Sequence, residues 1–191
     1  MFCKNFLRNI DRDPRYSSRV IFSDESLFTQ EGIFNMHNMH FWSEKNPRVM
    51  RLRNFQTRWK INTKSTRFSK DVPLFERNKI VFQQDGAGPH NARIVTNYLN
   101  EHFPGRWMCR YGPIHWSARS PDLNPLDFFL WGYCKEVIYK TLPEDIQELE
   151  TRLRHAIWNV DEEIMENVKI NLLKRMKAYV RMDGEHFEHL L

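Results

Sequence analysis

The sequence predicts a single α/β domain with a mixed β-sheet and a helical C-terminal half. Short β-rich segments come first and helical segments follow, an order that is typical of mixed α/β layers. The 191 residues are 41% hydrophobic and 28% charged, which is the composition of a folded chain with one core rather than of a disordered one.

The N-terminal part contains one clear strand signal. Residues 18–28 place Val20 and Phe22 at alternating positions, which favours a strand. Residues 51–62 are expected to hold one irregular strand. Residues 62–71 are polar and show no period, so we expect a loop there.

A strand, a turn and a helix follow in the middle of the chain. Residues 79–84 (KIVFQQ) form a short apolar strand that runs directly into the turn-forming residues 85–89. Residues 91–103 predict a helix with one apolar face. The next strand is expected within residues 106–116, at the letters RWMCRY.

The C-terminal half begins with a strong helix-start signal. Asn124 is a favourable N-cap, Pro125 suits the first helical position, and Asp127 falls in the first turn. This helix is expected to reach residue 139. Two further helices are predicted over 143–160 and 161–182.

Composition and charge restrict the functional class. The three cysteines are odd in number and far apart, which favours a reducing, intracellular setting over a disulfide framework. We expect no membrane span and no secretory signal. The formal net charge of +5 suits a polyanionic partner such as DNA.

Basic residues are concentrated in residues 44–79, where eleven Lys or Arg face three acids. Aromatic side chains are interleaved with these charges, as in surfaces that contact phosphates and stack on bases. A solvated basic loop explains the same pattern equally well, so both interpretations stay open.

Three aspartates stand out by their position. Asp24 lies within an apolar strand, Asp85 where a buried strand meets a glycine-rich turn, and Asp127 at a helix N-terminus. If the three carboxylates converge, their repulsion raises at least one pKa unless a divalent cation neutralises them. Such oxygen-only ligands suit Mg²⁺ or Mn²⁺.

Each aspartate also has an ordinary structural explanation. Asp24 could be a strand-end turn residue, Asp85 could belong to a common turn, and Asp127 could serve the helix dipole. Histidines at positions 90, 186 and 189 are interpreted as structural or solvated side chains rather than as ligands.

Four stretches resemble the conserved blocks of mariner-like DDE/DDD transposases. They are FSDESLF at 22–28, VFQQDGAGPHNARIVTNYLNEHFPGRW at 81–107, SPDLNPLDFFLWGYCKEVIY at 120–139 and DGEHFEHLL at 183–191. The resemblance implies an RNase H-like fold, a DNA partner and a nuclear location. It also implies a metal triad of Asp24, Asp85 and Asp127 that binds two Mg²⁺ or Mn²⁺ ions for phosphoryl transfer.

Three features depart from the family pattern. The interval of 41 residues between Asp85 and Asp127 is long and suggests a long-interval DDD branch. Too few residues lie between Trp59 and Val81 for the expected strands and crossover helix, so we predict an internal deletion near residues 62–71. The family's N-terminal helix-turn-helix region is also expected to be missing.

The expected consequence is a single, partial catalytic domain spanning residues 1–191. Loss of the neighbouring strands would leave the strand at 20–28 on the sheet edge, open to self-association. The preferred interpretation is a transposase-derived nucleic-acid-binding protein with impaired catalysis and non-specific DNA binding. The alternatives are a metal-dependent DNA strand-cleaving domain, a non-enzymatic interaction protein and a decayed open reading frame.

Overall fold

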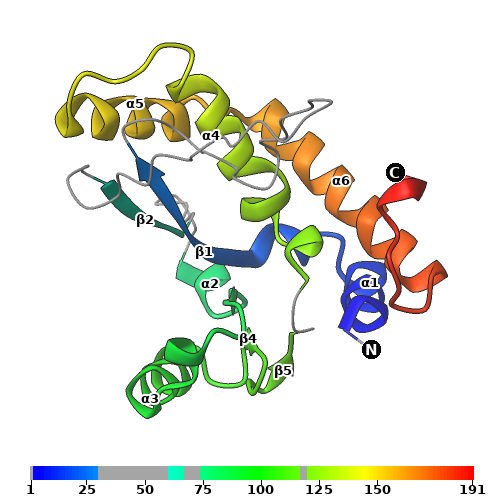
Figure 1. The fold of residues 1–191 in the computed structure, drawn as a ribbon. Coiled ribbons are helices and arrows are strands. Elements are labelled where there is room, and N and C mark those ends of the chain that lie inside the picture. Colours follow the sequence, from blue (N-terminus) through cyan, green and yellow to red (C-terminus); the bar gives the residue numbers. More distant parts are fainter. Residues whose placement is uncertain (1, 30–59, 67–73, 117–119) are drawn as a thin grey trace, which may run out of the picture.

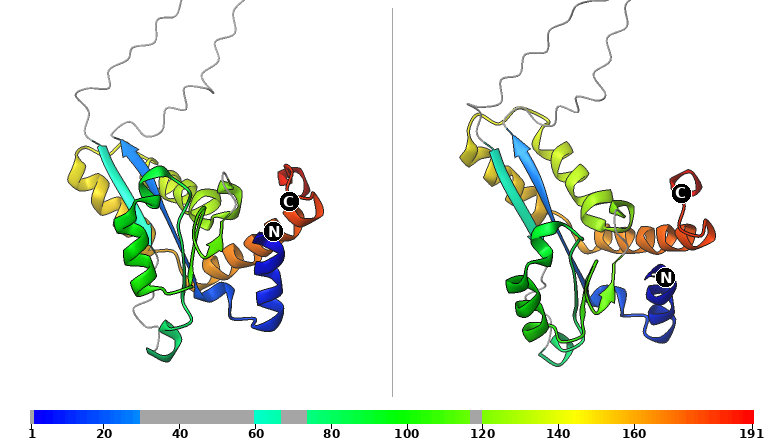
Figure 2. Two further views of the ribbon diagram at one scale, coloured as in Figure 1. Left: turned by 90° about the horizontal axis from the view of Figure 1, so that it is seen from below. Right: turned by 60° about the horizontal axis from the view of Figure 1, so that its bottom comes forward.

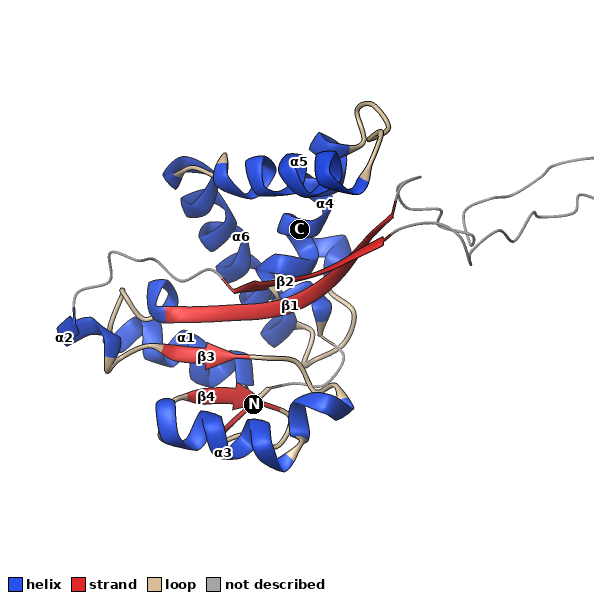
Figure 3. Cartoon of the chain, turned by 90° about the vertical axis from the view of Figure 1, so that its left-hand side faces the viewer, coloured by secondary structure: helices blue, strands red, loops and turns tan. Residues whose placement is uncertain are grey.

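A five-stranded sheet runs through the protein in the order β2-β1-β3-β4-β5 (Figures 1 and 3). The computed structural model describes residues 2–29, 60–66, 74–116 and 120–191. Strand β2 pairs antiparallel with β1, whereas β1, β3, β4 and β5 are parallel to one another. The strands are β1 (Val20–Thr29), β2 (Lys60–Thr66), β3 (Val81–Gln83), β4 (Trp107–Cys109) and β5 (Ile114–His115).

The helices lie around this sheet, and three of them follow one another in the C-terminal third of the chain (Figure 1). Asp145 and Asp161 accept the N-cap hydrogen bonds of the last two, from Glu148 N and Ile164 N, which fixes where these helices begin. The helices are α1 (Phe2–Arg12), α2 (Leu74–Arg77), α3 (Arg93–His102), α4 (Trp131–Ile138), α5 (Ile146–Trp158) and α6 (Glu162–Arg181).

Different helices cover the two faces of the sheet. Neighbouring side chains along β3 and β4 point to opposite faces, as in any strand. Val81 and Met108 belong to a core shared with α1 and α6, whereas Phe82 and Trp107 pack with α3. A further core joins α4 and α5 to the far end of β1, where Phe28 is 1% exposed.

The first and last helices lie side by side, so the described ends of the chain are close together (Figure 2). Lys4 on α1 forms an ion pair of 3.9 Å with Asp183, just beyond α6. Within the described ranges, no helix is both long and apolar enough to cross a lipid bilayer.

The predicted α/β architecture with a helical C-terminal half is confirmed, and the helices expected over 91–103, 143–160 and 161–182 are present with slightly shorter bounds. The N-terminal helix α1 and the short strand β5 were not predicted. The strand at RWMCRY is present as β4, reduced to three residues.

Two predictions around β1 are wrong. Residues 62–66 belong to β2 rather than to a loop, because β-branched threonines favour extended backbone and β1 supplies the ladder partners. β1 is therefore an interior strand, with β2 on one side and β3 on the other, and not a sheet edge. Residues 51–59 lie outside the described residues, and the deletion near 62–71 remains a prediction.

Candidate active site

Asp24 and Asp85 are brought level by the parallel pairing of β1 and β3. The register places Phe22 opposite Gln83. Asp24 follows Phe22 by two residues within β1, and Asp85 follows Gln83 by two residues, just beyond the end of β3. The strands therefore direct both carboxylates to one edge of the sheet.

Asp127 reaches this edge from the start of the helix that leads into α4. Asn124 caps this helix, because its Oδ1 accepts from Leu126 N at 3.2 Å, as the sequence predicted. The Asn124 Nδ2 donates to Asp127 Oδ2 at 3.1 Å. The first turn, Leu126–Leu130, is π-helical, a rare geometry that often occurs at functional sites.

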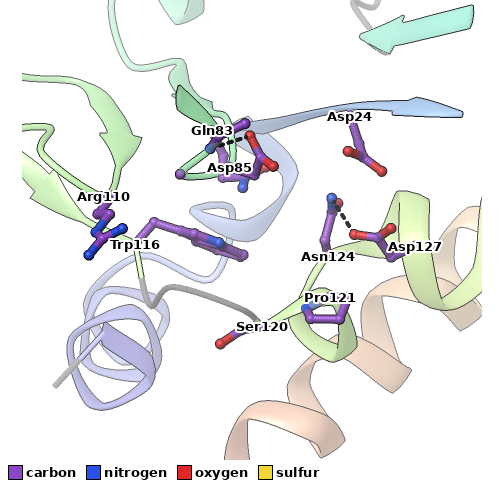
Figure 4. A pocket seen from close by; sticks show the side chains of 11 residues that line it. Asp24, Gln83, Asp85, Arg110, Trp116, Ser120, Pro121, Asn124 and Asp127 are labelled. Carbon is purple, nitrogen blue, oxygen red and sulfur yellow. Dashed lines mark hydrogen bonds between the residues drawn. The ribbon is translucent and has the colours of Figure 1, made fainter. Parts of the chain in front are cut away.

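The three aspartates line one cavity of about 400 Å³ (Figure 4). The cavity lies where the middle of β1 and the carboxyl end of β3 meet the segment before α4. It is lined by Asp24, Gln83, Asp85, Gly86, Ala87, Arg110, Trp116, Ser120, Pro121, Asn124 and Asp127. The structure thus brings the three sequence-predicted residues around a shared space, and their role as metal ligands remains a prediction.

Asp24 and Asp127 influence each other electrostatically. Partial burial of the Asp127 carboxyl, followed by the negative charge of Asp24 and a hydrogen bond between the two groups, raises the pKa of Asp127 from 3.8 to about 7. Asp24 is held in turn by the Trp131 indole, whose Nε1 donates to Asp24 Oδ2 at 2.9 Å. Asp24 and Asp127 together form one wall of the cavity. This wall therefore carries closely spaced negative charge at neutral pH and above.

Asp85 lies on the other wall and has hydrogen-bond partners of its own. Its Oδ1 accepts from Ala87 N at 3.1 Å and contacts His90 Nδ1. The other ring nitrogen of His90 lies 3.4 Å from Glu25 Oε1 on β1. His90, interpreted from the sequence as structural or solvated, therefore belongs to the site. Its position five residues after Asp85, in the same turn, is the signal that could have identified it.

The residues around the cavity fit a divalent cation by their chemistry. Three carboxylates offer only oxygen donors, which are the ligands that Mg²⁺ and Mn²⁺ prefer. The raised pKa of Asp127 indicates negative charge that a cation would neutralise. In the part of the chain that the structure describes, however, no three His, Cys, Asp or Glu side chains are close enough together to hold a metal ion.

A cation and an aromatic side chain complete the cavity. Among its lining residues, Arg110 alone is basic, and its guanidinium lies 5.2 Å from the centre of the Tyr111 ring, which is 70% exposed. The Trp116 ring is buried and packs edge-on against Phe2 at 4.7 Å. Of the basic-aromatic stretch 44–79, most residues lie outside the described part of the chain.

The amino-acid sequence is similar to that of a known transposase. The transposable element Tc3 transposase of Caenorhabditis elegans is 25% identical over 198 residues, which cover 87% of this chain and 57% of that protein. No protein-family model matches the chain. The chain thus spans less than two thirds of this relative's length.

Solved structures of the Mos1 transposase show the same fold. Its catalytic domain, solved with raltegravir and Mg, aligns with a TM-score of 0.63 and 17% identity over 98% of this chain and 94% of that chain. The mariner Mos1 paired-end complex with Mg aligns with a TM-score of 0.69 and 17% identity, covering 98% of this chain and 61% of that chain. The predicted RNase H-like fold and the resemblance to mariner-like transposase catalytic domains are confirmed.

Proposed function

We propose that this protein, similar in sequence and fold to mariner-like transposases, is a transposase-derived DNA-binding domain whose acid-lined cavity takes up Mg²⁺ or Mn²⁺. Strand cleavage is impaired in this proposal, and the protein acts in the nucleus. The observation that supports it best is the shared cavity: Asp24, Asp85 and Asp127 come from three separate family-like motifs and line one space.

Each aspartate has a distinct role in this proposal. Asp24, on the interior strand β1, would contact both cations, while Asp85 and Asp127 would each hold one. When bound, the cations would polarise a DNA phosphodiester and neutralise the charge that develops on it. Trp131 and Asn124 hold two of the carboxylates through hydrogen bonds of 2.9 and 3.1 Å.

The spacing of the ligands supports the proposed impairment of cleavage. Two-metal phosphoryl transfer depends on carboxylates held in productive geometry before the substrate binds. Among the described side chains, no three potential ligands are close enough to hold an ion. The aspartates must therefore move together on binding, and this rearrangement opposes both cation affinity and catalytic rate.

DNA is the proposed partner because a phosphodiester fits the cavity's charges. Another solved Mos1 structure with the same fold is a paired-end complex with the left transposon end, which is a property of that protein. In this chain, Arg110 lines the same cavity, with its side chain against Gly86 and across from Asp24 and Asp127 (Figure 4). From there its guanidinium would contact one oxygen of a phosphate group while another oxygen faces the cation. Phosphate contacts carry no sequence information, so we propose non-specific binding.

The test measures binding of a fluorescent DNA duplex by anisotropy with and without Mn²⁺. Wild-type protein is expected to bind more tightly when Mn²⁺ is present, and Asp85→Asn is expected to lose that increase while keeping its metal-independent binding. Equal affinity with and without Mn²⁺ in the wild type would contradict the proposal. Asp122→Asn is the matched control, because Asp122 lies in the same motif as Asp127 but does not line the cavity.

An active strand-cleaving enzyme is the second candidate, and the convergence of all three aspartates on one cavity favours it. Nicking of supercoiled plasmid that disappears in Asp85→Asn would support this activity. Nicking that is unchanged in the variant would show contamination by another nuclease.

A non-enzymatic interaction protein remains the third candidate. Within the described residues, no strand pairs with the outer edge of β2, and an open edge can accept a strand from another molecule. Self-association through this edge predicts a dimer in analytical ultracentrifugation, whereas a compact monomer at all concentrations would exclude it. A DNA-binding role through residues 44–79 alone predicts binding that depends on salt but not on metal.

A further inference from the structure

Gln83 is a buried polar side chain without a hydrogen-bond partner at the base of the cavity. The residue is 0% exposed, and neither its Oε1 nor its Nε2 has a partner among the described residues. Its main chain is satisfied, since the carbonyl accepts from Ser23 Oγ at 2.8 Å and the strand pairs on both sides. The unsatisfied groups therefore belong to the carboxamide alone.

The position of Gln83 links the core to the acidic cavity. Side chains two apart on a strand share a face, so Val81 and Gln83 lie on the same face of β3, and Asp85 follows just beyond the end of the strand. Val81 packs in the core with Met108, and Asp85 lines the cavity. Gln83 stands between them and also lines the cavity, as its place beside Asp85 in Figure 4 shows.

A leucine or methionine at this position would fill the same space without leaving polar atoms unpaired. Buried amide groups without partners destabilise a folded protein, and native structures rarely keep them without a ligand, a water molecule or an ion nearby. The neighbouring Gln84 shows the usual situation, because its Nε2 donates to the His90 carbonyl at 3.1 Å. The unpaired carboxamide of Gln83 therefore points to a ligand in the cavity.

We infer that Gln83 is a positioning residue that binds, through Oε1, a water molecule of the hydration shell of the cation held by the aspartates. This inference rests on the proposed function. Mg²⁺ gives up its waters reluctantly and keeps several when it binds protein carboxylates, so it presents O–H donors beyond the ligands themselves. The terminal torsion of glutamine is broad, which lets the carboxamide turn toward the cavity.

The inference predicts opposite effects on stability and on cation affinity. Gln83→Met removes the unpaired polar atoms, so the melting temperature of the metal-free protein should rise. The same change removes the water's acceptor, and the loss of such an outer-shell partner typically weakens metal binding by about 10–100-fold. A purely structural side chain would not shift these two quantities in opposite directions.

The experiment measures the Mn²⁺ dissociation constant by calorimetry, and the metal-free melting temperature, for wild type, Gln83→Met, Gln83→Leu and Gln83→Glu. Gln83→Leu provides a second apolar variant if Gln83→Met does not fold, and Gln83→Glu keeps an oxygen acceptor and should keep Mn²⁺ binding. Gln84→Met is the matched control, because it removes a made hydrogen bond and should lower the melting temperature.

The outcomes separate this inference from the function on which it rests. Weaker Mn²⁺ binding by both apolar variants, with a higher melting temperature, supports the role of Gln83. Unchanged Mn²⁺ affinity in these variants, while Asp24→Asn loses binding, overturns the inference and leaves the proposed function standing. Absence of Mn²⁺ binding by the wild type overturns both.

Discussion

Asp127 and Asp85 face the same cavity from opposite walls and are held by different interactions. Asp85 Oδ1 accepts an N–H from Ala87 and contacts His90. Asp127 accepts from Asn124 but also faces Asp24, and partial burial together with this negative neighbour raises the pKa of Asp127 to about 7. The second wall, unlike the first, therefore brings two carboxylates against each other.

The difference indicates where a cation would act. Negative charge that is already paired with donors gains little from a cation, while two carboxylates that repel each other gain much. Substitution of Asp24 or Asp127 should therefore weaken the binding of Mg²⁺ or Mn²⁺ more than substitution of Asp85 does.

The largest expected effect on stability comes from the donor that holds Asp24. Trp131→Phe removes the indole N–H from the Asp24 carboxylate and should lower the free energy of unfolding by about 3 kcal/mol, near the upper range for a hydrogen bond to a charged group. Trp107→Phe is the control, since the Trp107 indole donates to the neutral amide oxygen of Asn100 at 3.0 Å and should cost about 1 kcal/mol. Equal losses of unfolding free energy in the two variants, measured by urea denaturation, would show that the hydrogen bond to Asp24 gains nothing from the charge of the carboxylate.

The second effect is a pH dependence of the metal-free protein. The folded pKa of Asp127, about 7, lies above its ordinary value of 3.8, so the folded state binds the proton more tightly than the unfolded state. Stability from this group is complete below about pH 4 and falls as the pH rises toward 7. Solvent in the cavity screens the effect, which we expect to be on the order of 2 kcal/mol. Urea denaturation of wild type and Asp127→Asn across this range measures it, and a parallel pH profile in the two proteins would contradict the assignment.

A smaller effect is expected from the residue that caps the helix of Asp127. Asn124→Ala removes the N-cap acceptor and should destabilise the protein by about 1 kcal/mol. It also removes a hydrogen bond that lowers the pKa of Asp127, so that pKa should rise further. Asn124→Asp keeps the cap acceptor and separates the two effects. NMR titration of the Asp127 carboxyl would reveal an unchanged pKa in Asn124→Ala if the contact is unimportant.

The smallest effect concerns DNA rather than stability. Arg110→Gln should weaken binding of a DNA duplex by less than about tenfold and reduce the slope of log affinity against log salt by about 1, as expected for one lost phosphate contact. Arg154→Gln, on the exposed surface of α5, should leave the slope unchanged. Identical slopes for wild type and Arg110→Gln would exclude the phosphate contact.

Local sequence signals predicted the parts of the site that depend on local structure. The Asn124 cap and the strand position of Asp24 follow from residue types and periodicity. The π-helical turn that carries Asp127 has no such signal, because it is set by tertiary packing around Leu126 and Leu130. The pairing of β2 with β1 was also missed, since a polar edge strand shows no apolar alternation and is specified by its partner.

The sequence also could not show which of the polar side chains near Asp85 lack a hydrogen-bond partner. Gln83 lies within the family-like motif around Asp85, yet nothing local distinguishes this buried glutamine, which has no partner among the described residues, from the hydrogen-bonded Gln84 beside it. Such distinctions depend on which groups other elements bring into reach, and these arise only when the chain is folded.

The central claim is that Asp24, Asp85 and Asp127 still form one cation site, and a Mn²⁺ titration by calorimetry tests it most directly. Wild type and the control Asp122→Asn should bind Mn²⁺ saturably, while Asp24→Asn and Asp127→Asn should lose more than about 100-fold in affinity, beyond the loss typical of an outer-shell partner. Absence of binding in the wild type, or binding that both aspartate changes leave unaltered, would contradict the claim and leave the three carboxylates as neighbours without a shared ligand.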